Sequence, residues 1–346
     1  MKVKKHPQLN IVNTLTLPSV QPLETLFVFL FVACFPAYAV LLQETTTTPK
    51  TFADWCLNKT NLSVETLRTV DAMLQVVNTQ DCYQAEKLLS TRTELSLQSK
   101  LISDLRPLSE LTNLRRLSLH NNSIADLKPL SGLTNLVSLT LYNNRITNLK
   151  PLSGLTKLAV LYLSNNSIAD LKPLSTLTNL YKLLLYKNQI TYLKPLSKLT
   201  NLAWLDLGNN QITDLKPLSG LTSLTDLYLR NNQIADLRPL STLPNLTRLF
   251  LDNNQIADLK PLSSLPNLAG LSLDNNQIAD LKPLSTLPNL KVLNLSNNQI
   301  ADLRPLSSLT NLKVLYLGNN PTLTNKTCPI KPASICRFAS DLPPSR

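Results

Sequence analysis

Leucine and isoleucine recur along most of the chain in an order that repeats every 22 residues. One repeat places its apolar positions at Leu114, Leu117, Leu119, Ile124, Leu127, Leu130 and Leu133. Leu117 and Leu119 alternate with variable residues, and this period of two predicts a short strand with one buried face. The later part of each repeat carries a proline, for example Pro129, which cannot join a strand ladder and favours extended backbone or 3₁₀ turns. Each repeat therefore predicts one strand and an irregular return segment.

An asparagine marks the same place in successive repeats without a slip in register. We call these residues the frame asparagines: Asn122, Asn144, Asn166, Asn188, Asn210, Asn232, Asn254, Asn276, Asn298 and Asn320. We expect each side chain to turn inward, where its amide can bond backbone groups that would otherwise be buried unpaired. A fixed period of this length is typical of a solenoid, whose strands stack in parallel about 4.8 Å apart. The predicted fold is an α/β solenoid with a concave parallel sheet and a 3₁₀ or irregular convex side.

The repeat also resembles a known family. Its L-x-x-L-x-L-x-x-N pattern over residues 94–320 resembles leucine-rich repeat proteins, which implies a horseshoe. The recurring segments L-K-P-L-S-x-L-T-N-L and N-N-Q-I-x-D-L resemble the 22-residue repeats of bacterial internalin-type proteins. Such repeats bind host-cell receptors in some bacteria, while similar repeats regulate phosphatases inside eukaryotic cells. The resemblance implies a binding role and leaves the partner open, because one fold serves many functions.

The N-terminal segment predicts export. Lys2, Lys4 and Lys5 precede an apolar stretch at 26–35 and the small-x-small sequence 37–39, which indicates a signal peptide over 1–39. Two alternatives stay open: Cys34 is a lipidated cysteine, or residues 26–42 remain as an uncleaved anchor. All three interpretations place the repeats outside the cytoplasm, in a secreted, periplasmic or cell-surface protein. We expect attachment to a membrane only through an uncleaved or lipidated leader.

The rest of the chain divides around the repeats. We expect a polar linker at 40–51, a helical N-terminal cap at 52–93, ten full repeats and one partial repeat at 94–320, and a C-terminal cap and tail at 321–346. Helical spacing follows the predicted N-cap Ser63, and Asp81 with Gln84 marks a second helix start. The resulting protein is predicted to be one elongated monomer.

Four cysteines remain after the leader is removed, and they flank the repeats. In an oxidising compartment we expect Cys56 to pair with Cys82 and Cys328 with Cys336, so that each disulfide stabilises one cap. A zinc site is disfavoured because neither pair has C-x-x-C spacing and His120 is the single histidine left. We therefore predict no metal and no cofactor.

Charge adds little to this picture. The formal net charge is +12, but much of the excess comes from a column of lysines and arginines two residues after a column of aspartates. Alternating columns of opposite sign indicate a solvated face. A nucleic-acid or other polyanion site would need an uninterrupted basic groove, which the acidic residues Asp206, Asp226, Asp252 and Asp274 interrupt.

Catalysis is not expected either. A nucleophile usually needs a neighbouring base, and His120 stands at a variable strand position where we expect a solvated or rim residue. The chain has six glycines and no glycine-rich phosphate loop. We therefore predict that the protein is not an enzyme.

The variable strand positions carry the candidate function, because the repeated residues serve the fold. Although aromatic residues make up 5% of the chain, large side chains gather on six consecutive strands. The predicted partner-binding residues are Tyr142, Tyr162, Tyr181, Leu184, Tyr186, Trp204, Asp206, Asp226, Tyr228, Arg230, Arg248, Phe250 and Asp252. Aromatic side chains grouped with arginine and aspartate resemble a protein-binding hot spot. The structural alternative is that strands favour aromatics, which cover one another across the sheet.

Several readings of this face stay open. A glycan could stack on the same aromatics, with the aspartates and Arg230 as hydrogen-bond partners. Asp252 and Asp274 occupy the same position on adjacent strands, where they would repel each other unless Arg230 pairs with Asp252 or a calcium ion binds. The repeat that contains Leu184 also has Lys187 and Tyr192 where other repeats have asparagine and aspartate, through either partner contact or drift.

Overall fold

The computed structural model describes residues 49–338 of the 346-residue chain. These residues belong to one compact unit, Thr48–Arg346. The predicted signal peptide, the lipidation of Cys34 and the anchor at 26–42 all lie outside the described residues.

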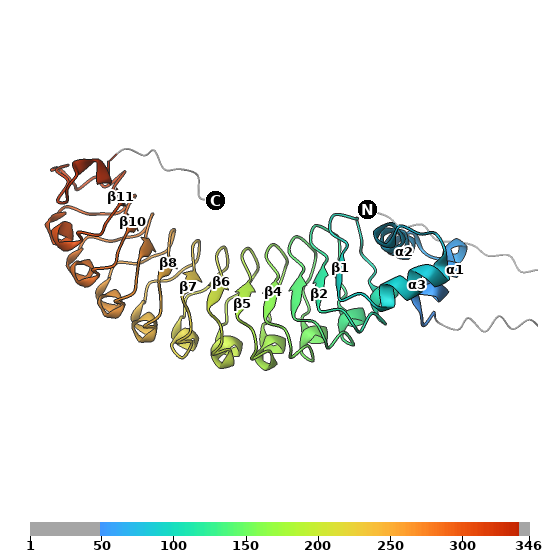
Figure 1. The fold of residues 1–346 in the computed structure, drawn as a ribbon. Helices are drawn as coiled ribbons and strands as arrows, with labels where there is room; N and C mark the ends of the chain where they lie inside the picture. The colour runs from blue at the N-terminus through green and yellow to red at the C-terminus, as the bar shows by residue number, and fades with distance from the viewer. Residues whose placement is uncertain (1–48, 339–346) are drawn as a thin grey trace, which may run out of the picture. The chain divides into compact units, whose positions relative to one another are not determined.

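A single sheet of twelve parallel strands runs through the described unit, with the strands in the order of the sequence. The strands are β1 Glu94–Ser96, β2 Arg116–Ser118, β3 Ser138–Thr140, β4 Val160–Tyr162, β5 Lys182–Leu184, β6 Trp204–Asp206, β7 Asp226–Tyr228, β8 Arg248–Phe250, β9 Gly270–Ser272, β10 Val292–Asn294, β11 Val314–Tyr316 and β12 Cys336–Arg337. From β1 to β11 each residue pairs with the residue 22 positions later, for example Leu205 with Leu227. The strands line the concave side and the turns line the convex side (Figure 1), which confirms the predicted horseshoe solenoid.

Strand alternation produces the core. The central leucine of each strand from β2 to β11 is buried with at most 1% of its surface exposed. The isoleucine two residues after each frame asparagine from Asn122 to Asn298, such as Ile212, is equally buried. The residues on either side of that leucine face the concave surface. Because apolar side chains contribute roughly 25 cal/mol for each Å² removed from water, this continuous leucine column holds the repeats together.

The return segments form 3₁₀ helices, as the prolines predict. The ten in the repeats are η2 Arg106–Leu108, η3 Lys128–Leu130, η4 Lys150–Leu152, η5 Lys172–Thr176, η6 Lys194–Lys198, η7 Lys216–Leu218, η8 Arg238–Thr242, η9 Lys260–Ser264, η10 Lys282–Thr286 and η11 Arg304–Ser308. An aspartate initiates most of these turns: Asp126 Oδ1 accepts the Lys128 backbone N–H at 2.8 Å, and Asp236 Oδ1 accepts that of Arg238 at 2.9 Å. The alternating charges therefore have a structural origin.

The frame asparagines turn inward, as predicted. Asn210 Oδ1 accepts the Ile190 backbone N–H at 3.0 Å, and its Nδ2 donates to the Leu207 and Leu185 carbonyls at 2.9 and 3.1 Å. One side chain thus satisfies backbone groups of its own repeat and of the preceding repeat. The same set of bonds recurs at the other frame asparagines, for example at Asn276.

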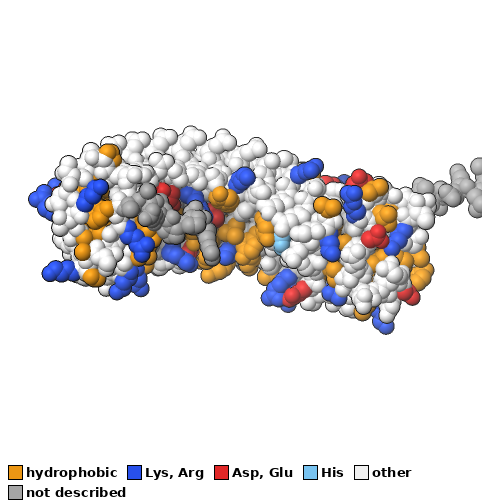
Figure 2. All heavy atoms as spheres, turned by 90° about the horizontal axis from the view of Figure 1, so that it is seen from above, with side chains coloured by type: hydrophobic (Ala, Val, Ile, Leu, Met, Phe, Trp, Pro, Cys, Tyr) orange, Lys and Arg blue, Asp and Glu red, His pale blue; other side chains and the backbone are white. Residues whose placement is uncertain are grey.

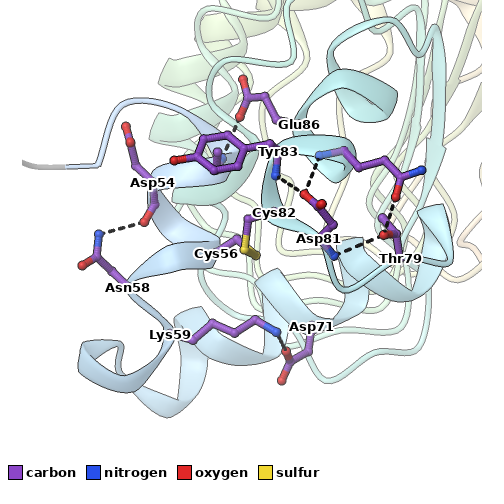
Figure 3. Close-up of a disulfide and its surroundings, with 12 residues drawn as sticks. Asp54, Cys56, Asn58, Lys59, Asp71, Thr79, Asp81, Cys82, Tyr83 and Glu86 are labelled. Atoms are coloured by element: carbon purple, nitrogen blue, oxygen red, sulfur yellow. Dashed lines mark hydrogen bonds and ion pairs between the residues drawn. A yellow bond between two sulfur atoms is a disulfide. The ribbon is translucent and has the colours of Figure 1, made fainter.

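Three α-helices form the N-terminal cap: α1 Phe52–Leu57, α2 Val64–Val77 and α3 Cys82–Ser90, with the short 3₁₀ helix η1 at Lys59–Asn61. Ser63 and Asp81 are the N-caps of α2 and α3, as expected, whereas α1 was not predicted as a separate helix. Figure 3 shows the Cys56–Cys82 disulfide that joins α1 to α3, which is the predicted pairing. The cap binds the first turn through Thr66 Oγ1, which donates to Asp104 Oδ2 at 2.6 Å.

The other end of the sheet is covered by the C-terminal segment. Cys336 and Arg337 form β12, which pairs with β11, and Cys336 is bonded to Cys328 as predicted. The 3₁₀ helix η12 at Ala333–Ile335 precedes β12 and buries Ile335. Among residues 49–338 no helix is long and apolar enough to cross a membrane.

Candidate functional site

The predicted partner-binding residues lie on the strands β3 to β8 or directly beside them. Side chains at the first and third positions of these strands face the concave surface, since the central leucine points into the core. Figure 2 views the molecule from above and shows hydrophobic side chains near the middle of the surface, with basic and acidic side chains close to them. The face therefore combines apolar contact area with both signs of charge.

Three aromatic rings from adjacent strands form what we call the aromatic stack: Trp204, Tyr228 and Phe250. The Trp204 and Tyr228 centroids are 5.7 Å apart with an interplanar angle of 14°, and those of Tyr228 and Phe250 are 4.7 Å apart at 4°. All three side chains are half-buried. Because the rings stack along the direction in which the strands succeed one another, both faces of Tyr228 are covered by neighbours. The Tyr228 ring consequently exposes its edge and neither of its faces.

Two cations lie close to the Trp204 ring, one from β5 and one from β8. Lys182 Nζ lies 3.7 Å from the Trp204 ring centroid and 5.6 Å from that of Tyr162. The Arg248 guanidinium carbon lies 5.0 Å from the Trp204 centroid. Cations over an indole face are attracted by its quadrupole, so these side chains are held against the ring.

Arg248 is anchored by a carboxylate from the neighbouring strand. Its Nε forms an ion pair with Asp226, whose side chain is only 7% exposed. Hydrogen bonding to Asp226 raises the pKa of Arg248 against the opposing effect of partial burial. Asp226 also accepts a hydrogen bond from the Thr225 hydroxyl at 2.8 Å. The pair therefore fixes the arginine that covers Trp204.

Burial also changes the acid-base behaviour of the face. It raises the pKa of Tyr228, and it raises the pKa of Asp206 although the Gly208 N–H and Arg230 act in the opposite direction. Asp206 Oδ1 accepts that Gly208 N–H at 3.0 Å. The carboxylate is thus turned toward its own backbone.

Arg230 does not make the pair with Asp252 that the sequence suggested. Its guanidinium carbon lies 5.5 Å from the Tyr186 ring centroid, two strands away in the opposite direction. Gly208, in the repeat between those of Arg230 and Tyr186, leaves the space through which the Arg230 side chain reaches the ring. A Cβ at Gly208 would lie 3.0 Å from Arg230 Cγ and 3.1 Å from Tyr186 Cδ2. Asp252 instead accepts the Ser272 hydroxyl, with the Asp274 backbone N–H at 3.3 Å.

The neighbouring aspartates Asp252 and Asp274 accept hydrogen bonds from different side chains. Burial raises the pKa of Asp252, and Asp274 raises it further against the bond from Ser272. Asp274 Oδ1 accepts the Asn297 amide at 2.7 Å. No group of three or more potential metal ligands occurs within the described residues, so the structure gives no support to the calcium alternative.

The remaining predicted residues lie outside the stack. Tyr142 stacks on His120 with centroids 4.3 Å apart, so the histidine is half-buried, and burial lowers its pKa. Tyr181 is 56% exposed, and Leu184 is half-buried on β5.

Sequence reasoning missed two contributors, Lys182 and Gly208. Lys182 occupies the position of Trp204 on the preceding strand, so its proximity to that ring could have been inferred from register. Gly208 lies between Tyr186 and Arg230 at the same position of three successive repeats, and this small residue was the available signal for the direction of the Arg230 side chain.

Comparison with known proteins defines the family. Residues 112–154, 134–179, 156–198, 200–242, 244–286 and 288–327 match the family model described as Leucine Rich repeats (2 copies). The solved structure of an internalin, inlF, from Listeria monocytogenes is 30% identical, with a TM-score of 0.63, over 80% of this chain and 95% of that one. The chain is an internalin-type leucine-rich repeat protein.

Two further structures resemble this leucine-rich repeat protein. An internalin C2 from Listeria monocytogenes is 37% identical over 60% of this chain and 83% of that one, with a TM-score of 0.48. The plant peptide hormone receptor RGFR1, solved in complex with RGF2, is 26% identical over 63% of this chain and 38% of that one, with a TM-score of 0.57. No curated protein matches by sequence. Leucine-rich repeats generally serve as binding scaffolds, and the family and its neighbours indicate a protein-binding module.

Proposed function

We propose that this leucine-rich repeat protein is exported, acts as a monomer and binds a protein partner through its concave face, in adhesion or as an envelope scaffold. The observation that carries the proposal is the aromatic stack with its two cations. Tryptophan, tyrosine and arginine supply most hot spots in protein interfaces. Their contacts with one another hold the side chains in place before binding, which lowers the entropy lost on association.

The arrangement of the rings favours a protein over a glycan. Sugars bind aromatic residues mainly on the ring face, but Trp204 and Phe250 cover both faces of Tyr228, and Lys182 lies over Trp204. A protein partner can pack side chains against ring edges and pair with the charges around them. The glycan alternative therefore depends on the outer face of Phe250, beside the small residues Gly270 and Ser272 of β9.

Disulfides support the proposed location. Cys56–Cys82 and Cys328–Cys336 stabilise the two ends of the solenoid, and such bonds persist in oxidising compartments outside the cytoplasm. We propose cleavage of the leader after Ala39 and a secreted, periplasmic or cell-surface protein. The relatives named internalin add to this support.

The test is binding of residues 40–346 to arrays of extracellular proteins and glycans. The same chain carrying Tyr186→Ala, Trp204→Ala and Tyr228→Ala is run in parallel. A matched control carries Tyr83→Ala and Tyr192→Ala, which remove two exposed tyrosines outside the candidate site.

The outcomes separate the alternatives. A protein hit that the concave triple variant loses and the control retains would support the proposal. A glycan hit with the same pattern would favour the second candidate. Hits that both variants retain would rule out the concave face. Thermal unfolding of all three chains establishes that lost binding does not reflect lost folding.

A further inference from the structure

Two arginines of the concave face differ in one respect that matters for recognition. Arg248 forms an ion pair with a carboxylate of the chain, Asp226, whereas Arg230 has Asp206 only at longer range: no ion pair between residues 49 and 338 includes Arg230. The Nε atom of Arg230 is buried and has no hydrogen-bond partner. An unpaired donor of a charged group in a buried position is unfavourable, because it has lost water without gaining an acceptor.

The position of Arg230 is built into the strand sequence. The side chain crosses the gap at Gly208 to lie over Tyr186, and a Cβ at that glycine would lie 3.0 Å from Arg230 Cγ and 3.3 Å from the Arg230 carbonyl oxygen. A ring beneath the guanidinium holds its plane and leaves its edge for an acceptor. Asp206, the acidic side chain of the intervening strand, directs Oδ1 to the Gly208 N–H and does not satisfy Arg230.

A second cation is the neighbour of Tyr186 in the sequence. Lys187 follows Tyr186 and has a φ of 55°, a left-handed conformation that asparagine adopts in the repeats on both sides, at Asn165 and Asn209. Lysine tolerates this conformation less well than asparagine. It also replaces an amide in a ladder of side-chain bonds, in which Asn165 Nδ2 donates to Asn143 Oδ1 at 2.6 Å. The residue that departs from the repeat is thus a cation next to Tyr186.

We infer that Arg230, held over Tyr186 through the gap at Gly208, receives a carboxylate side chain of the protein partner, with Lys187 as a second cation at this subsite. The planar fork of an arginine matches a carboxylate, which accepts from the two terminal nitrogens because Nε is buried. The inference rests on the proposed function and specifies its chemistry: the partner presents an aspartate or glutamate above β5 to β7. The partner thereby supplies the acceptor that Asp226 supplies to Arg248.

The test uses the arginine Nε–Hε resonances of ¹⁵N-labelled residues 40–346, which include the whole compact unit. Hexaglutamate is titrated, with hexalysine and sodium sulfate at matched charge as controls. We expect the Arg230 signal to shift and saturate with hexaglutamate, and the Arg248 signal to stay in place because its Nε already pairs with Asp226. An unmoved Arg230 signal, or an equal response to sulfate, would overturn the inference.

Two variants guard against a purely structural effect. Gly208→Ala should abolish the Arg230 shift by displacing its side chain, while Arg230→Lys keeps the charge but removes the fork and should weaken hexaglutamate binding about tenfold. A thermal midpoint unchanged by Arg230→Lys shows that the fold persists. If that variant binds hexaglutamate as well as the native chain, the fork has no role and the inference fails.

The array partner distinguishes this inference from the proposed function. Loss of a protein partner in the aromatic triple variant, with full binding by Arg230→Gln, would retain the concave site and reject the carboxylate subsite. About tenfold weaker binding of that partner by Arg230→Gln would support both. Retained binding by the triple variant would reject the concave site, whatever the titration shows.

Discussion

The frame asparagines and the concave side chains run through the same strands, a few residues apart, but they respond to different constraints. Each frame asparagine bonds backbone groups of two successive repeats, as Asn210 does with Ile190 and Leu185. The concave residues mainly contact one another, as Trp204 and Tyr228 do. Residues that satisfy the buried backbone must be the same in every repeat, whereas residues that meet only side chains can vary and recognise a partner.

The largest effect should follow from breaking the frame. Asn210→Ala leaves the Ile190 N–H and two carbonyls without partners in a buried position, which should cost about 3 kcal/mol of unfolding free energy. Urea unfolding followed by circular dichroism measures this loss. Asn201→Ala is the matched control, because its Nδ2 makes one exposed bond to the Thr178 carbonyl. Equal losses in the two variants would contradict the role assigned to the inward amide.

Removing a concave residue should instead affect binding. Trp204→Ala should weaken affinity for the array partner by at least about 2 kcal/mol, roughly 30-fold in Kd, because it removes the ring under Lys182 and Arg248. Surface plasmon resonance measures the change, with Tyr83→Ala on the N-terminal cap as control. We expect a smaller loss of folding stability than in Asn210→Ala. A larger loss of unfolding free energy than in Asn210→Ala would show that Trp204 stabilises the fold as the frame asparagines do.

Lys187 lies where the two sets of residues meet. Lys187→Asn restores the residue that suits a left-handed backbone and should raise the unfolding free energy by about 1 kcal/mol. Chemical denaturation measures the gain, and affinity for the array partner should fall at the same time. A variant that is no more stable than the native chain would show that the lysine is not strained at this position.

The smallest effect concerns Asp252, whose pKa is raised by burial. Its contribution to stability is complete below the ordinary aspartate value of 3.8 and is lost as pH rises through the folded-state pKa. Asp252→Asn should therefore stabilise the protein slightly at pH 7, by less than Lys187→Asn does, and make no difference near pH 3. Thermal unfolding as a function of pH tests this.

Asp104 provides the opposite case for the same experiment. Burial disfavours its charge, but bonds from Arg106 and Thr66 prevail and the pKa of Asp104 is lowered. Its contribution is present above the ordinary value and lost as pH falls through the folded-state pKa. Asp104→Asn should destabilise the protein at pH 7 and converge with the native chain in acid. If stability changed with pH in the same direction in Asp252→Asn and Asp104→Asn, the opposite roles assigned to these two carboxylates would be wrong.

The sequence predicted the fold well because the fold depends on local, repeated residues. Leu117, Leu119 and Asn122 already define strand, core and inward amide within one repeat, and register then follows from the period. The geometry of the site was less accessible. Whether Arg230 turns toward Asp252 or toward Tyr186 depends on the space left by Gly208 on the strand between, which no single repeat reveals. Tyr228 could likewise be placed on the face, but the covering of its ring depends on side-chain rotamers on three strands.

The 22-residue register also shapes how this protein can evolve. Because neighbouring units fit together in the same way along the solenoid, a duplicated or deleted unit between β9 and β11 would keep every leucine and asparagine in place. The same event between β6 and β8 would separate Trp204, Tyr228 and Phe250. Gene-level expansion would therefore leave the aromatic stack intact on one side of it and disrupt the stack within it.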